Sequence, residues 1–297
     1  MEFGNKPIGV YHDSISIFIV NISYSHMQSK VLLVIVNYKS NDYCDEQISS
    51  FIDIASGLDY EIIVCNNESL LNPYTSPIDN VKVIDSVENL GYFGSLNRLS
   101  RLVDFSSFDF VIVGNADLTW IDLEGLLCNY ESNVGIVAPR IISRDGLNQN
   151  PHRLNRPSFL KSVLLRFLFS SYWIYVLFVK LAKFRAMITA RSNTIIESRE
   201  VFARHVFSAH GACVVFRKVF FERIESLDMN FFLYGEEDWM AGNCSKHALD
   251  IICVDNVVVR HDESVSTSQV ANKEKWHMKK EAYIINKTKF AKQLFRI

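Results

Sequence analysis

The segment GNAD, residues 114–117, directly follows the very apolar run FVIV at 110–113. A carboxylate at such a strand end, here Asp117, is suited to holding Mg²⁺ or Mn²⁺ against a diphosphate, because hard cations take oxygen ligands and usually keep phosphate partners. The cation would offset the charge that builds on a departing diphosphate. An aspartate at a strand end also often makes only a turn or a helix cap, and for this motif alone that alternative stays open.

Three consecutive carboxylates, Glu236, Glu237 and Asp238, follow the segment FFLYG at 231–235. Crowded carboxylates repel one another and lose hydration when buried, and both effects raise the pKa of one of them. Such a group is suited to act as the general base that removes a proton from an acceptor hydroxyl. The alternative is a solvated helix N-terminus, where the helix dipole favours acidic residues.

The segment NLGYFGSLN, residues 89–97, contains two glycines, Gly91 and Gly94. Glycine permits close approach of a ligand to the backbone, and we expect Gly94 to open a helix whose N-terminus faces phosphate. The spacing is not the GxGxxG of dinucleotide-binding proteins, and no P-loop lysine follows.

Apolar runs and helical patterns alternate along the chain from residue 30. The predicted strands are 31–38, 61–67, 81–85, 110–117, 135–139, 205–216 and 251–261, and the predicted helices include 42–55, 94–102 and 123–130. Continuous apolar strands separated by helices indicate an α/β fold with a mainly parallel sheet covered on both faces. Ligands bind such sheets beyond the carboxyl ends of the strands, where Asn37, Asn66 and Asp117 would lie.

The middle of the chain has a different composition. Residues 146–196 include no Asp or Glu but eight Lys or Arg, and within them residues 167–179 are uncharged and rich in aromatic side chains. Thirteen residues are too few to span a bilayer, which takes about 20. We expect this segment, with the basic C-terminal helix at 270–297, to lie on an anionic membrane surface. A buried helix with solvated basic ends is the alternative.

Overall composition excludes several classes of protein. The 31 basic and 33 acidic residues give a net charge of −2, which argues against a nucleic-acid-coating protein. None of the six cysteines forms a C-x-x-C pair, which favours reduced thiols in the cytosol over a disulfide framework or zinc site. No secretory signal is visible, so residues 1–29 are interpreted as an appendage, with an extra edge strand as the alternative.

Together these segments resemble the family 2 glycosyltransferases, most closely the bacterial branch that builds O-antigen and capsule and includes rhamnosyltransferases. The likeness covers about residues 31–286. VIVNYKS resembles the opening strand with its nucleotide-contacting Asn-Tyr, and NNES resembles Asp-Asn-x-Ser, with Asn66 where Asp is usual. ENLGYFGSLN, GNAD and HGACVVF…YGEED resemble the glycine-containing segment, the DXD motif and the acceptor-side block. His261 resembles a late histidine of the family.

The resemblance implies a GT-A (Rossmann-like) fold and inverting transfer of a sugar from a dTDP- or UDP-sugar to an acceptor hydroxyl, with Mg²⁺ or Mn²⁺ as cofactor. The implied metal ligands are Asp117 and His261. The implied donor-binding residues are Asn37, Tyr38, Asn66, Asn67, Asn89, Gly91, Gly94, Asn97 and Asn115. The base lies among Glu236–Asp238: position favours Glu237, and the shorter, stiffer side chain favours Asp238. The family's basic residue after the acidic block has no clear counterpart, Lys246 being the nearest.

The predicted organisation is an appendage at 1–29, a nucleotide-sugar-binding half at 30–145, a basic membrane-associating insertion at 146–200, an acceptor half at 201–268 and a basic helix at 269–297. The expected acceptor is a lipid-linked saccharide in surface polysaccharide synthesis, at the inner face of the cell membrane, with no nucleic-acid partner. Two alternatives remain: a nucleotidyltransferase, and a non-catalytic or weakened membrane-associated nucleotide-sugar-binding protein.

Overall fold

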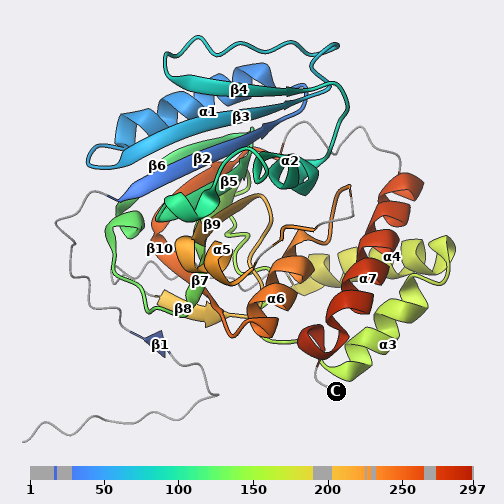
Figure 1. Cartoon of the computed structure of the whole chain (residues 1–297). Helices are drawn as coiled ribbons and strands as arrows, with labels where there is room; N and C mark the ends of the chain where they lie inside the picture. Colours follow the sequence, from blue (N-terminus) through green and yellow to red (C-terminus); the bar gives the residue numbers. More distant parts are fainter. Residues whose placement is uncertain are drawn as a thin grey trace, which may run out of the picture.

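The computed structural model describes residues 17–18, 29–189, 203–224, 226–228, 232–263 and 272–295. Most of the expected appendage, and residues 190–200 of the expected basic insertion, therefore lie outside the described residues. One ten-stranded sheet runs through both expected halves of the domain, in the order β1-β8-β10-β7-β9-β5-β2-β3-β4 with β6 paired to β10 (Figure 1).

The strands are β1 (Ile17–Phe18), β2 (Lys30–Asn37), β3 (Asp59–Asn67), β4 (Val81–Ser86), β5 (Phe110–Asn115), β6 (Leu118–Asp122), β7 (Val134–Ser143), β8 (Ala203–Val206), β9 (Cys213–Arg217) and β10 (Asp250–His261). The helices are α1 (Asn41–Ile54), α2 (Tyr92–Leu99), α3 (Phe159–Leu168), α4 (Tyr172–Thr189), α5 (Lys218–Arg223), α6 (Glu236–Lys246) and α7 (Asn272–Leu294). Phe105–Ser107 and Glu124–Leu127 form short 3₁₀ turns.

The first half of the sheet is parallel, as the apolar runs predict. Strand β2 pairs in parallel with both β3 and β5, and β3 pairs in parallel with β4. Leu32 and Val34 pack into the core beneath α2, whereas Val31, Leu33 and Ile35 pack beneath α1. Because both faces of β2 are buried, its sequence is apolar without alternation.

The second half of the sheet is mixed. Strand β9 runs antiparallel to both β5 and β7, and β10 is parallel to β7 but antiparallel to β8. The single strand predicted over 205–216 is wrong: β8 and β9 are separate strands, and the loop between them bonds to the 150s segment through Phe207 and Arg153. The described part of the N-terminal stretch, β1, pairs with β8 at the sheet edge.

Two helix predictions also need correction. Residues 123–130 form only a 3₁₀ turn. The uncharged segment 167–179 is not one helix but falls across the break between α3 and α4. At this break Ser170 bonds the Phe167 carbonyl through both its amide (3.1 Å) and its hydroxyl (2.6 Å), which competes with continuation of the helix.

Helices α3, α4, α6 and α7 gather on one side of the molecule (Figure 1). Helix α6 is buried through Trp239 and Met240, and α7 packs along it. The two helices approach so closely at Gly242 that a Cβ there would lie 2.4 Å from the Phe290 ring. This packing holds the acidic N-terminus of α6 against the sheet.

Candidate active site

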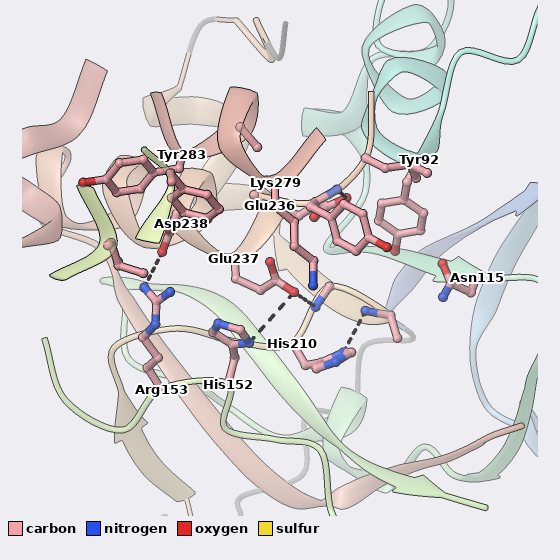
Figure 2. Close-up of a pocket in the computed structure, with 18 of the residues that line it drawn as sticks. Tyr92, Asn115, His152, Arg153, His210, Glu236, Glu237, Asp238, Lys279 and Tyr283 are labelled. Carbon is pink, nitrogen blue, oxygen red and sulfur yellow. Dashed lines mark hydrogen bonds and ion pairs between the residues drawn. The ribbon is translucent and has the colours of Figure 1, made fainter. Parts of the chain in front are cut away.

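A cavity of about 450 Å³ lies where the carboxyl ends of β5 and β10 meet the N-terminus of α6 (Figure 2). Five of the candidate residues, drawn from segments far apart in the sequence, line it: Asn115, Glu236, Glu237, Asp238 and His261. The remaining walls come from the start of α2, the loop before β9, the segment before α6, the 150s segment, α3 and α7.

Asp117 lies beside this cavity, in contact with His261. It follows β5 in the turn to β6, and pairing of β6 with β10 sets Leu118 opposite His261. The Asp117 Oδ1 and His261 Nε2 atoms are 3.4 Å apart, with side chains 12% and 9% exposed. Register of two neighbouring strands thus brings together two residues that are 144 positions apart in the chain.

The other ring nitrogen of His261 is fixed by Gln149. Nδ1 lies 2.9 Å from Gln149 Oε1, and the amide nitrogen of Gln149 donates to Glu263. In the tautomer with its proton on Nδ1, His261 donates to Gln149, and Nε2, which faces Asp117, has a lone pair for a cation. A histidine oriented in this way by a polar partner is typical of metal ligands.

Asp117 and His261 are suited to bind a divalent cation whose other ligands do not come from protein side chains. Within the described ranges, no group of three or more His, Cys, Asp or Glu side chains is placed to hold a metal. Asp117 and His261 would therefore supply two ligands, and phosphate oxygens or water would supply the others, as is usual for Mg²⁺. Asn115 lies 3.5 Å from His261 Nε2 and lines the same space.

The three consecutive carboxylates have three different environments. Glu236 is buried, and its Oε1 accepts a hydrogen bond from the Tyr234 amide at 3.0 Å. Burial raises the pKa of Glu236, and the neighbouring Glu237 adds a smaller effect in the same direction. The resulting pKa is about 8, so this carboxyl group is mostly neutral at pH 7. Gly235, in the left-handed region at φ 91°, lies too close to Ala282 to accept a side chain.

Asp238 forms an ion pair with Arg153, and both side chains are mostly buried. The backbone of Arg153 bonds to Ser208 in the loop between β8 and β9. Asp238 thus holds the 150s segment against α6, and its charge is neutralised by the guanidinium.

Glu237 is directed into the cavity (Figure 2). Its Oε1 accepts a weak hydrogen bond from the Gly211 amide at 3.4 Å and lies 4.0 Å from His152 Nδ1. Burial lowers the pKa of both His152 and His210, which keeps these imidazoles neutral near pH 7. Of the three acids, Glu237 is therefore the one whose carboxyl group faces the cavity with neither full burial nor a guanidinium partner.

A row of polar side chains forms at the ends of β2, β3 and β4. Asn37 Nδ2 donates to Asn66 Oδ1 at 3.0 Å, and Asn66 Nδ2 donates to Asp85 Oδ1 at 2.8 Å. The carboxylate that the resemblance expects at position 66 is thus found one strand further along, at the register partner Asp85. Asp85 was missed, although it ends the apolar run 81–85.

The other expected donor-binding residues are spread along the same edge. Asn67 bonds to Ser95 and to the Leu90 amide, and Asn89 accepts from the Gly91 amide. Helix α2 begins at Tyr92, so Gly94 lies in its first turn rather than opening it. A Cβ at Gly91 would lie 2.0 Å from the Phe232 carbonyl, so this glycine permits close packing of the chain itself.

The remaining two expected residues have other surroundings. Asn97 lines a separate hollow with Ser100 and Arg101. The Tyr38 ring is covered by Lys39, whose ammonium lies 4.8 Å from the ring centroid and pairs with Glu68.

The cavity also contains a cation that the sequence analysis missed. Lys279 of α7 lies 4.8 Å from the centroid of the Tyr234 ring, and its ammonium end points into the cavity (Figure 2). Lys246, the candidate from the sequence, is instead exposed in the last turn of α6. The basic pattern of the C-terminal segment gave no sign that one of its lysines faces inward.

The family model of glycosyl transferase family 2 matches residues 32–224, which include the parallel half of the sheet, Asp117 and the loop before β9. The chain belongs to glycosyl transferase family 2. A curated relative, the low-salt glycan biosynthesis hexosyltransferase Agl10 of Haloferax volcanii, is 27% identical over 215 residues, which cover 71% of this chain and 60% of the relative.

Two solved structures were compared with this family 2 chain, and the first of them shares its fold. GalNAc-T7, in a crystal structure with UDP, GalNAc and Mn²⁺, superposes with a TM-score of 0.55 at 13% identity, over 89% of this chain and 48% of that one. The mannosyltransferase PcManGT from Pyrobaculum calidifontis, in complex with GDP-Man and Mn²⁺, gives a TM-score of 0.49 at 13% identity, over 92% and 65% of the two chains. The family model and the superposition on GalNAc-T7 show that the architecture is the GT-A fold of glycosyltransferases, as predicted.

Proposed function

We propose that this chain is an inverting glycosyltransferase that moves a sugar from a nucleoside-diphosphate donor to an acceptor hydroxyl. The observation that carries the proposal is that one cavity receives both Glu237, the available carboxylate of the acidic cluster, and His261, which is paired with Asp117. A base and a metal-binding pair facing the same space are what single displacement requires.

In this mechanism Glu237 takes the proton from the acceptor hydroxyl. The acceptor oxygen forms a bond to the anomeric carbon as the bond from that carbon to the diphosphate breaks, and the nucleoside diphosphate leaves with the electron pair. Because attack and departure occur on opposite sides, the configuration at the anomeric carbon inverts. Asp238 and Arg153 position Glu237 by fixing the first turn of α6.

Asp117 and His261 Nε2 would hold a divalent cation, which when bound offsets the charge developing on the leaving diphosphate. Lys279 would add a positive charge to the same cavity, where charge interactions are stronger than in water.

The proposed donors are UDP- and dTDP-sugars, including hexosyl and rhamnosyl donors. The curated relative is named a hexosyltransferase, and UDP is named in the GalNAc-T7 structure. The row Asn37–Asn66–Asp85 would frame the nucleotide, with Asp85 accepting from the base. The proposed acceptor is a saccharide of surface polysaccharide synthesis.

A panel of nucleotide sugars tests this function by thermal stabilisation with and without Mn²⁺, since a ligand that binds the folded state raises its melting temperature. With the donor so found, product analysis should show release of the nucleoside diphosphate and an inverted anomeric centre. Release of pyrophosphate would instead identify a nucleotidyltransferase. A chain that binds the donor but transfers no sugar would be the non-catalytic nucleotide-sugar-binding protein, and one that binds neither donor nor metal would contradict both interpretations.

A further inference from the structure

Helices α3 and α4 carry an unusually apolar outer surface. Leu160 and Trp173 are 77% and 76% exposed, and Phe167 and Leu177 are 58% and 60% exposed. Val163 and Leu164 extend the same surface along α3. Soluble proteins rarely expose contiguous large apolar side chains of this kind, and such patches mark binding sites for proteins or membranes.

The inner side of the same helices is firmly attached to the protein. Ser162 is buried, and its carbonyl accepts a hydrogen bond from the Tyr283 hydroxyl of α7 at 3.1 Å. Phe169 packs on Tyr283 and Tyr172 packs on Trp276, with ring centroids 5.1 and 5.9 Å apart. The two helices that carry the apolar outer surface are therefore held to α7 by their inner sides.

In the described residues no single helix is long and apolar enough to cross a bilayer, although α3 and α4 together pass by length and composition. The two helices are bent by 120° at their break. Two short helices at this angle, each anchored on one side, present an apolar face that suits a position in the headgroup region.

The charged side chains near this apolar surface favour an anionic membrane as its binding partner. Lys161, Arg166 and Lys180 are exposed beside the apolar side chains. Residues 146–196 contain eight Lys or Arg and no Asp or Glu. The exposed basic side chains of α3 and α4 are attracted to the negative surface of a membrane that contains anionic lipids.

We propose that the outer face of α3 and α4, from Phe159 to Ala182, docks on a bilayer of anionic lipids, with Leu160, Phe167 and Trp173 inserted at the headgroup boundary. The inner side of α3 lines the catalytic cavity through Leu165 and Phe169. Since a helix is about 10 Å across, docking would hold the cavity roughly that far from the lipid surface. The corollary that the acceptor saccharide is lipid-linked rests on the proposed function.

Sedimentation of the full chain with phosphatidylglycerol vesicles, with neutral phosphatidylcholine vesicles and without vesicles tests the docking. The protein should sediment with phosphatidylglycerol vesicles at 0.1 M salt, and binding should weaken at 1 M, where the Debye length falls from about 10 to about 3 Å. The triple change Leu160→Ser, Phe167→Ser and Trp173→Ser should lower partitioning at least ~100-fold, because each residue loses its apolar transfer energy.

The matched control changes Leu70, Leu71 and Leu102 to Ser, since these leucines are 76%, 76% and 63% exposed outside α3 and α4. This control should bind vesicles as the wild type does. Both triple variants should keep the wild-type melting temperature and donor binding, which separates this proposal from that of the function. Equal recovery of wild type with and without vesicles, or equal binding of both triple variants, would overturn docking. A dimer that the α3–α4 variant alone converts to monomer, with vesicle binding unchanged, would assign the face to a second copy of the chain.

Discussion

Replacing Glu237 by glutamine removes the basicity of the side chain but keeps its size and its hydrogen-bonding atoms. The amide oxygen of glutamine still accepts from the Gly211 amide, which lies 3.4 Å from Oε1 in the wild type. The fold and the donor site should therefore be unchanged. General-base catalysis contributes typically ~10²–10⁴-fold, so turnover should fall by that factor while donor affinity stays within about twofold.

The matched control is Asp238→Asn, one residue further along α6. Asp238 and Arg153 form an ion pair with side chains 15% and 20% exposed, so the change leaves a mostly buried guanidinium without its counter-charge. The cost should be about 1–3 kcal/mol of unfolding free energy, below that of a fully buried pair because some water reaches both groups. The melting temperature should fall by about 2–4 °C per kcal/mol, with a smaller loss of turnover than for Glu237→Gln.

The assay measures initial rates at saturating donor, donor affinity by calorimetry and melting temperature for the wild type and both variants. Loss of turnover in Glu237→Gln with intact donor binding, together with a destabilised but active Asp238→Asn, is the expected pattern. Near-normal turnover of Glu237→Gln would refute the assignment. If Asp238→Asn is then inactive at a temperature where it is folded, Asp238 is the base. If neither variant loses turnover, the acidic cluster is only a helix start.

Three further outcomes follow from the same geometry. Asp117→Ala should abolish metal-dependent donor binding and lower turnover at least ~100-fold, measured by Mn²⁺ titration and initial rates, with a smaller loss of metal affinity in His261→Ala. The folded-state pKa of Glu236, about 8, lies above the ordinary value of 4.5, so the folded protein retains a proton that the unfolded chain releases. The free energy of unfolding should thus fall as pH rises from 4.5 to 8, and denaturant titrations should show a flatter profile for Glu236→Gln. Asp85→Asn should weaken binding of a uridine or thymidine nucleotide about 10-fold in calorimetry, with affinity for Mn²⁺ unchanged, because the base loses a charged acceptor; unchanged nucleotide affinity would remove Asp85 from the site.

The parallel half of the sheet was predictable because burial on both faces leaves a direct mark on the sequence. The run at 31–38 is apolar without alternation, and it forms a central strand between β3 and β5. Strand β9 has an equally apolar sequence but runs in the opposite direction. The loop that leads from β8 to β9 bonds to Arg153, far away in the chain, and no local sequence pattern encodes such a contact or the direction of the strand that follows.

In the acidic cluster, too, the local sequence could not predict contacts with residues far away in the chain. Its composition indicated an acid of altered pKa, and a helix start rotates neighbouring side chains about 100° apart. The direction of each acidic side chain depends on a partner from a distant part of the sequence. This partner is Arg153 for Asp238 and the Gly211 amide for Glu237. The local pattern could therefore predict the group of three, and only tertiary contacts distinguish its members.

The basic C-terminal helix had a sequence that favoured a membrane surface, but in the structure α7 packs within the protein through Trp276, Tyr283 and Phe290. These large side chains lie on the face that meets α6 and the α3–α4 pair, and Lys279 enters the cavity beside them. Helix α7 thus contacts both the candidate cavity, through Lys279, and the helices proposed to meet lipid, and α3 itself lines the cavity through Leu165. Since the Tyr283 hydroxyl donates to the carbonyl of Ser162 in α3, a shift of α3 on docking would be transmitted to the helix that carries Lys279. The proposed membrane position and the charge in the cavity would therefore be linked by direct contacts, which the composition of the two basic segments does not predict.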